Sequence, residues 1–210
     1  QEGVRGQKAV VWRLVDAIAK PAVFKDVVNE HATKLAATSN RPAGAKGVQL
    51  TPLNRTIEAD RLSYTHVSVE IDRIKRTATF TVKAPTAPVA ADKPGIEAAG
   101  ANWYPLAMTR ELDDAILHMR TNELDIGTWL LKTVGDAAAV LASDAAVLSN
   151  QDHWFARETL GMMRRTFARI DVSSRSLFAL IEPGSCFAGS LAELAFAADR
   201  AYMLVLPDDA

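Results

Sequence analysis

The feature that most constrains the fold is an apolar run that leads directly into a loop of small residues and then into a helix. Residues 177–181, read LFALI, are continuously apolar and lack helical spacing, and Pro183 and Gly184 end the run. Such a run is typical of a strand that is covered on both faces. It predicts an α/β chain in which this central strand delivers the loop and the helix.

The loop after this strand is suited to close approach of the backbone. In the stretch GSCFAGS, from Gly184 to Ser190, all residues except Phe187 are small. Backbone N–H groups at the start of the following helix can therefore point into a cleft. A helix N-terminus favours negative charge, so this position suits a charge that develops during a reaction.

The segment ALIEPGSCFAGSLAELAFAAD resembles the strand, glycine loop and helix of the crotonase (enoyl-CoA hydratase/isomerase) superfamily. This resemblance implies an α/β, crotonase-like spiral of strand-strand-helix repeats, truncated here and preceded by the helical tail of an upstream crotonase module. Further runs are similar, more narrowly, to a branch of benzoyl-CoA lyases with two crotonase-like modules: RELDDAILHMRTNEL, DHWFARETLGMMRRTFARIDVSSRSLFALIEPGSCFAG and AELAFAADRAYM.

The resemblance implies a parent protein that acts as a carbon–carbon lyase in benzoate degradation. Its acyl-CoA substrate would be epoxidised or dihydroxylated benzoyl-CoA, whose ring is opened with release of formate and without a metal or redox cofactor. The parent is expected to be a homodimer. Two other functions stay open, namely an enoyl-CoA hydratase or isomerase and a non-catalytic structural or dimerisation module.

Enzymes of this superfamily need two backbone amides that bind the oxygen of a thioester enolate. Gly184, Gly189 and Ser190 correspond to the later amide loop, although GSCFAGS is one residue longer than usual and lacks two of three glycines. The earlier loop should follow a strand, but VGDAAAVLASDAAVL after Thr133 predicts an ordinary helix. Half of the oxyanion site is thus predicted to be missing, which favours a packing role for Gly189.

Glu193 and Glu182 are the candidate catalytic carboxylates. Glu193 aligns with the acid-base residue of the superfamily's hydratases, and Glu182 ends the strand beside the same loop. However, the letters SLAE also form a capping box, in which Glu193 would accept a hydrogen bond from the Ser190 amide. We favour capping for Glu193, and the main acid-base residues are expected upstream of Gln1.

Composition excludes several other classes. A net charge of -1 with scattered lysine and arginine argues against nucleic-acid binding. The single Cys186 cannot form an internal disulfide and is expected to be a buried filler. No span resembles a membrane helix or a signal peptide, so we expect a cytoplasmic protein without membrane contact. A metal site is not expected, because the histidines lack metal-binding spacing: His31, His66, His118 and His153.

The chain is predicted to have three parts. Residues 1–40 form the helical tail of a first module, with helices over 7–19 and 21–39. Residues 41–62 are a linker that begins near Pro42. Residues 63–210 form a second, degenerate module, incomplete because neither end of the chain matches the edge of a complete unit. Its predicted elements are a hairpin from 64 to 82, an irregular excursion over 84–100, a helix over 109–121, a strand over 126–131, a helix over 150–170 and the central strand.

One acidic cluster lies on the predicted helix over 109–121. Glu111, Asp113 and Asp114 are interpreted as a solvated helix face rather than as paired catalytic carboxylates. Asp114 and His118 are four residues apart, which predicts a pair on the helix surface.

Overall fold

The computed structural model describes residues 3–41 and 44–205. The chain divides into two compact units, Gln1–Gly47 and Val48–Ala210, which are described separately. Each of the three predicted segments includes residues that lie outside the described ones. They are Gln1 in the first segment, Pro42 in the second and residues 206–210 in the third.

The first unit is helical and buries little apolar surface. It contains α1 (Gln7–Val11), a 3-10 turn (Pro21–Val23) and α2 (Phe24–Ala37). The predicted second helix is confirmed, and Pro21 opens it because proline fits the first turn of a helix. The prediction of one helix over 7–19 is wrong beyond Val11, because the chain leaves the helix there and Arg13 adopts a left-handed φ of 55°.

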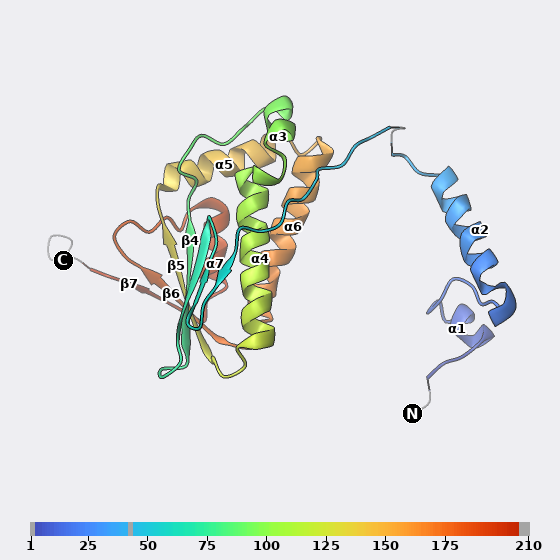
Figure 1. Cartoon of the computed structure of the whole chain (residues 1–210), viewed down its shortest axis with the longest axis horizontal. Coiled ribbons are helices and arrows are strands. Elements are labelled where there is room, and N and C mark those ends of the chain that lie inside the picture. Colours follow the sequence, from blue (N-terminus) through green and yellow to red (C-terminus); the bar gives the residue numbers. More distant parts are fainter. Residues whose placement is uncertain (1–2, 42–43, 206–210) are drawn as a thin grey trace. The chain divides into compact units, whose positions relative to one another are not determined.

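The second unit is built on a seven-stranded sheet whose strands follow chain order, which confirms the predicted α/β class (Figure 1). Neighbouring strands from β1 to β4 are antiparallel, and those from β4 to β7 are parallel. The strands are β1 (Thr56–Ile57), β2 (Arg61–Ser63), β3 (Val67–Asp72), β4 (Thr77–Lys83), β5 (Thr128–Val134), β6 (Ser176–Ile181) and β7 (Arg200–Met203).

Helices fill the connections between the parallel strands. The order strand-strand-helix occurs where β3 and β4 are followed by the first two helices of this unit, and further along the described chain single strands alternate with helices. The helices are α3 (Lys93–Ala99), α4 (Tyr104–Asn122), α5 (Ala137–Ser149), α6 (Trp154–Asp171) and α7 (Glu193–Phe196), with 3-10 helices η2 (Gly100–Asn102) and η3 (Gly189–Ala192).

Two segments differ from the sequence predictions. Residues 56–57 and 61–62, predicted as linker, lie in strands β1 and β2, because β2 pairs with β3 and Leu62 enters the core. The predicted irregular excursion over 84–100 contains helix α3. Its N-terminus is capped by Asp92, whose side chain accepts the N–H of Gly95 at 3.2 Å.

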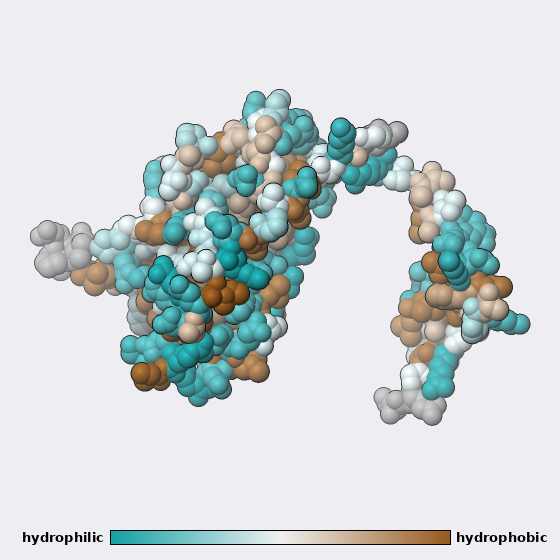
Figure 2. Space-filling view, in the orientation of Figure 1, coloured by the Kyte–Doolittle hydropathy of each residue, from teal (hydrophilic) through white to brown (hydrophobic). Residues whose placement is uncertain are grey.

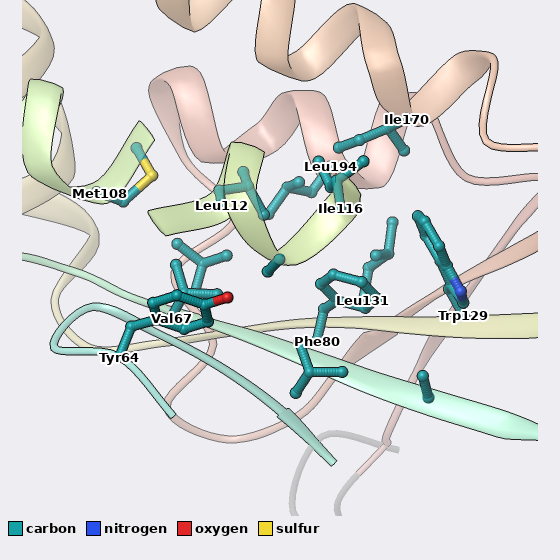
Figure 3. Close-up of a cluster of buried hydrophobic side chains, with 14 of the residues drawn as sticks. Tyr64, Val67, Phe80, Met108, Leu112, Ile116, Trp129, Leu131, Ile170 and Leu194 are labelled. Atoms are coloured by element: carbon teal, nitrogen blue, oxygen red, sulfur yellow. The ribbon is translucent and has the colours of Figure 1, made fainter. Parts of the chain in front are cut away.

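The core lies between one face of the sheet and helices α4, α6 and α7 (Figure 3). Burial alternates along β3, β4 and β5, as expected for strands covered on one face. Trp129 on β5 packs against Phe80 on β4, with ring centroids 4.7 Å apart. The prediction that β6 is covered on both faces is wrong, because Leu177 and Ala179 are buried whereas Phe178 and Leu180 are only half-buried.

Glu111 on α4 is buried, so the prediction of a solvated acidic face on this helix is wrong. Only 4% of the residue is exposed. Its carboxylate accepts the backbone N–H groups of His66 at 2.6 Å and Val67 at 3.1 Å. Glu111 therefore anchors the start of β3 to α4.

The neighbouring carboxylates on α4 hold other segments. Asp113 forms an ion pair with Arg169 on α6 at 2.7 Å. Asp114 forms an ion pair with Arg55 at 2.8 Å and accepts the Tyr64 hydroxyl at 2.7 Å. The predicted pair between Asp114 and His118 is wrong, since these partners from other segments engage Asp114.

Removing the Glu111 charge should change how stability depends on pH. Burial raises the pKa of Glu111, although hydrogen bonds from the backbone of residues 65–67 oppose this effect. A carboxyl group with a raised pKa in the folded state adds stability below its unfolded pKa, and this contribution is lost as pH rises through the folded pKa. Relative to Glu111→Gln, the native chain should therefore gain free energy of unfolding as pH falls from 7 toward the acid range, measured by urea unfolding.

Glu58→Gln is the matched control, because Glu58 is exposed. The difference between this variant and the native chain should stay small across the same pH range. A free-energy difference between the native chain and Glu111→Gln that does not vary with pH would contradict the prediction.

Candidate functional site

An apolar groove lies between α5, α6 and the segment η3–α7. It has two parts, of about 520 and 440 Å³, which share lining residues Leu160, Met163, Ser190 and Glu193. In the first part α6 adds Arg164, Phe167 and Asp171, and in the second part α5 adds Leu141, Asp144 and Leu148. The groove is the place where the loop singled out from the sequence meets a cleft.

Backbone and side-chain bonds hold the loop between β6 and η3. Gly184 has a left-handed φ of 83°, and its carbonyl accepts the N–H of Gly135 at 3.0 Å. The Cys186 N–H donates to Thr133 Oγ1 at 2.9 Å, and 1% of Cys186 is exposed. The expectation of a buried cysteine is confirmed, and burial raises the pKa of its thiol.

The Asp144 carboxylate accepts a hydrogen bond from the backbone at the start of η3. The N–H of Ser190 donates to Asp144 Oδ2 at 2.6 Å, a short charge-assisted hydrogen bond. Gly189 has a left-handed φ of 49°, and a Cβ added there would lie 2.0 Å from the same oxygen. Glycine is therefore required at 189 for two reasons, the backbone conformation and the approach of Asp144.

This contact corrects the capping box predicted for Ser190 and Glu193. No side-chain capping bond forms at the start of η3 or α7, because Ser190 lies inside η3 and its N–H is bound to Asp144. Asp144 lines the groove and binds the loop, and the sequence did not point to it. The only available signal was that it is the single charged residue between Ala137 and Ser149.

The structure gathers some of the candidate residues and separates others. Gly189, Ser190 and Glu193 line the groove together. Glu193 is exposed, and within the described part of the chain its carboxylate has no hydrogen bond or ion pair. Glu182 and Gly184 are not among the lining residues, and Glu182 forms an ion pair with Lys132 on β5. The catalytic and oxyanion roles of all five residues stay predictions.

The charges of the groove disfavour an anion. Asp144, Asp171 and Glu193 contribute three carboxylates, and Arg164 contributes one guanidinium. Loop amides are preorganised donors only while they are unoccupied, and the Ser190 amide already serves a carboxylate. Here the helix predicted within VGDAAAVLASDAAVL forms as α5 from Ala137 onward, whereas Val134 ends β5 and Asp136 caps the helix, so most of this segment offers helical backbone instead of an earlier amide loop. The groove can bind apolar groups but offers poor support for a thioester oxyanion.

Among residues 3–41 and 44–205, no group of three or more His, Cys, Asp or Glu side chains could hold a metal ion. In the same ranges, no helix has the length and apolar character required to cross a membrane.

No family model matches the chain. It is 59% identical over 203 residues to the benzoyl-CoA-dihydrodiol lyase of Aromatoleum evansii, a match that covers 97% of this chain and 37% of that protein. The chain thus spans little more than a third of the length of this relative. An enoyl-CoA hydratase structure from Geobacillus kaustophilus HTA426 is similar over 68% of this chain and 47% of its own, with 15% identity and a TM-score of 0.43.

Proposed function

We propose that this chain is one part of a benzoyl-CoA-dihydrodiol lyase and serves as a supporting second module of that enzyme. The observation that carries the proposal is the identity of 59% over 97% of the chain. The longer protein would add water to an epoxidised or dihydroxylated benzoyl-CoA, open its ring by carbon–carbon cleavage and release formate. The proposal includes aromatic degradation in the cytoplasm, a homodimeric parent and no metal or redox cofactor.

The supporting role is proposed because an amide of the loop is already hydrogen-bonded to another residue of the chain. Because the Ser190 amide is bound to Asp144, a thioester oxygen would have to displace an internal carboxylate to reach it. The core beside the loop is nevertheless complete, since Trp129, Leu131 and Leu191 are almost fully buried. A module with an intact core and an occupied amide is better suited to packing than to thioester chemistry.

A chimaera tests the assignment to the lyase. In the Aromatoleum evansii lyase, the segment matched over 203 residues would be replaced by the corresponding residues of this chain. We expect the chimaera to consume the dihydrodiol of benzoyl-CoA with kcat/KM within about tenfold of the parent, because replaced surfaces at this identity should still pack. A chimaera that folds and melts like the parent but lacks activity would contradict the proposal.

A second candidate function, enoyl-CoA hydratase or isomerase activity at this groove, is favoured only by Glu193, a carboxylate that lines the groove without a partner in the described chain. Glu193→Gln in the chimaera decides between the two. We expect kcat/KM to stay within about threefold, and the free energy of unfolding within about 0.5 kcal/mol, because the side chain is exposed and caps nothing.

Glu182→Gln in the same chimaera is the matched control. It also removes one carboxylate beside the loop but breaks a partly exposed ion pair, so it should cost about 1 kcal/mol or less. A hundredfold loss of turnover in Glu193→Gln, with unchanged melting, would instead establish acid-base catalysis by Glu193.

A further inference from the structure

A separate cavity of about 310 Å³ lies between helix α4 and the segment that precedes β1, and its lining residues all differ from those of the apolar groove. We call residues 51–55 the strap, and Figure 1 shows this part of the chain running beside α4. The Thr51 carbonyl accepts a hydrogen bond from Arg110 Nη2 on α4 at 2.7 Å. Arg55 binds both carboxylate oxygens of Asp114 on α4, at 3.0 and 2.8 Å. Two arginines therefore fix the strap as one wall of the cavity.

Arg110 supplies the positive charge of this cavity. Its side chain is half-buried, and it donates one hydrogen bond, to the strap. Within the described part of the chain, Arg110 forms no ion pair, unlike Arg55 and Arg169 beside it on the same helix face and on α6. A guanidinium carries five N–H donors in a planar fork, so most of the donors of Arg110 are left for a ligand.

The other charged residue of the cavity, Glu111, is bound to the protein itself. Its Oε2 accepts the backbone N–H groups of His66 and Val67, at 2.6 and 3.1 Å. These donors offset the negative charge of the carboxylate at the start of β3. The cavity thus differs from the apolar groove, where three carboxylates surround one guanidinium, and it is the better place for an anion.

His66 adds a neutral imidazole to the same cavity. The ring is half-buried and meets Tyr104 edge-on, with ring centroids 5.1 Å apart. Burial lowers the pKa of His66, and the nearby charge of Lys83 adds to this effect. Within the described chain neither ring nitrogen has a hydrogen-bond partner, whereas a neutral imidazole offers one N–H donor and one acceptor. His66 and Arg110 are therefore two half-buried polar groups that a ligand could satisfy.

The remaining wall of the cavity includes apolar side chains. They are Pro52 and Leu53 on the strap and Ala101 and Ala107 on the opposite side. Leu53 is half-buried and packs against the core, so it gives the cavity a fixed apolar surface. Figure 2 shows a mixed, largely hydrophilic surface on this side of the second unit. Small-molecule sites measure about 300–1,000 Å³, so this cavity suits a small ligand rather than a protein partner.

We propose that this cavity binds a small monocarboxylate with an apolar body, whose carboxylate is held by Arg110 and His66 and whose body packs against Leu53 and Ala107. A planar carboxylate matches the fork of a guanidinium in two parallel hydrogen bonds. A cationic ligand is disfavoured, because it would meet the charges of Arg110 and of Lys83, which acts on His66. The site does not depend on the proposed lyase function and goes beyond it.

Calorimetric titration of the chain with benzoate tests the proposal. We expect saturable binding with a Kd of about 1 mM or tighter. Benzamide has the same ring without the charge, and inorganic phosphate has charge without an apolar body, so each should bind at least about tenfold more weakly than benzoate. Benzoate that does not bind saturably would overturn the proposal, and so would benzamide or phosphate that binds as tightly as benzoate.

Substitutions locate the binding. Arg110→Gln should weaken benzoate binding at least about tenfold, whereas Arg120→Gln, on the same helix but outside the cavity, is the matched control and should leave the Kd within about twofold.

Arg110 also holds the strap, so Ala107→Leu provides a variant that fills the cavity while leaving the bond from Arg110 to Thr51 in place. It too should weaken binding at least about tenfold. The chimaera, titrated in the same way, should show the same loss with Arg110→Gln. If both arginine variants bind benzoate equally, or if Ala107→Leu binds it like the native chain, the proposal is wrong.

Discussion

The chain alone should consume the dihydrodiol of benzoyl-CoA at least about a thousandfold more slowly than the Aromatoleum evansii lyase. Loss of a single oxyanion donor typically reduces turnover by about 10²–10³-fold. In this chain the Ser190 amide is bound to Asp144, and α5 offers helical backbone where a second donor loop would be needed. The measurement compares the loss of the CoA thioester and the release of formate at equal concentrations of the two proteins.

The chimaera is the control for this comparison, because it contains the same residues together with the rest of the lyase. Cooperative thermal unfolding of the chain alone would show that its inactivity does not result from misfolding. Turnover by the chain within tenfold of the full-length enzyme would contradict the supporting role, and would make the groove at Ser190 an active site.

Gly189→Ala should destabilise the chain by about 3 kcal/mol. A left-handed conformation costs a non-glycine residue about 1–2 kcal/mol, and crowding in a packed site adds about 1–3 kcal/mol. The crowding is specific, because the new Cβ would lie 2.0 Å from Asp144 Oδ2 and 3.3 Å from a methyl carbon of Leu141. Urea unfolding of the native chain and the variant measures the difference.

A double-mutant cycle separates the two causes. When Asp144 is first truncated by Asp144→Ala, the main clash is gone, so adding Gly189→Ala should cost only the conformational term of about 1–2 kcal/mol. Gly184→Ala is the matched control, since Gly184 also has a left-handed φ of 83° but no atom lies within 4 Å of the added Cβ. Strict additivity of Asp144→Ala and Gly189→Ala would show that the two residues do not interact.

Local patterns predicted the elements whose apolar residues recur with a clear period. The run at 177–181 is β6, and the apolar residues after Asn150 lie on α6. Short elements were missed because their stability comes from distant partners. In β2, for example, Leu62 is a lone apolar residue in sequence, and only pairing with β3 places it in the core.

The candidate site shows a similar division. The sequence predicted a small-residue loop before a helix, and the structure brings Gly189, Ser190 and Glu193 to one groove. The sequence alone could not reveal which carboxylate accepts the Ser190 N–H. Glu193 and Asp144 are competing acceptors, and only Glu193 is close to Ser190 in sequence. The distant carboxylate binds it, since α5 positions Asp144 Oδ2 2.6 Å from the Ser190 nitrogen.

The Asp144 carboxylate binds the loop at Ser190 even when no ligand is in the groove. A preorganised oxyanion site keeps its backbone N–H groups free for the charge that develops on the substrate. Here α5 supplies the acceptor, the Asp144 carboxylate, so the chain itself holds the turn without a ligand. The shape of the loop is therefore maintained by folding itself, and an ordered loop at Gly189 is evidence of an intact module rather than of a bound thioester.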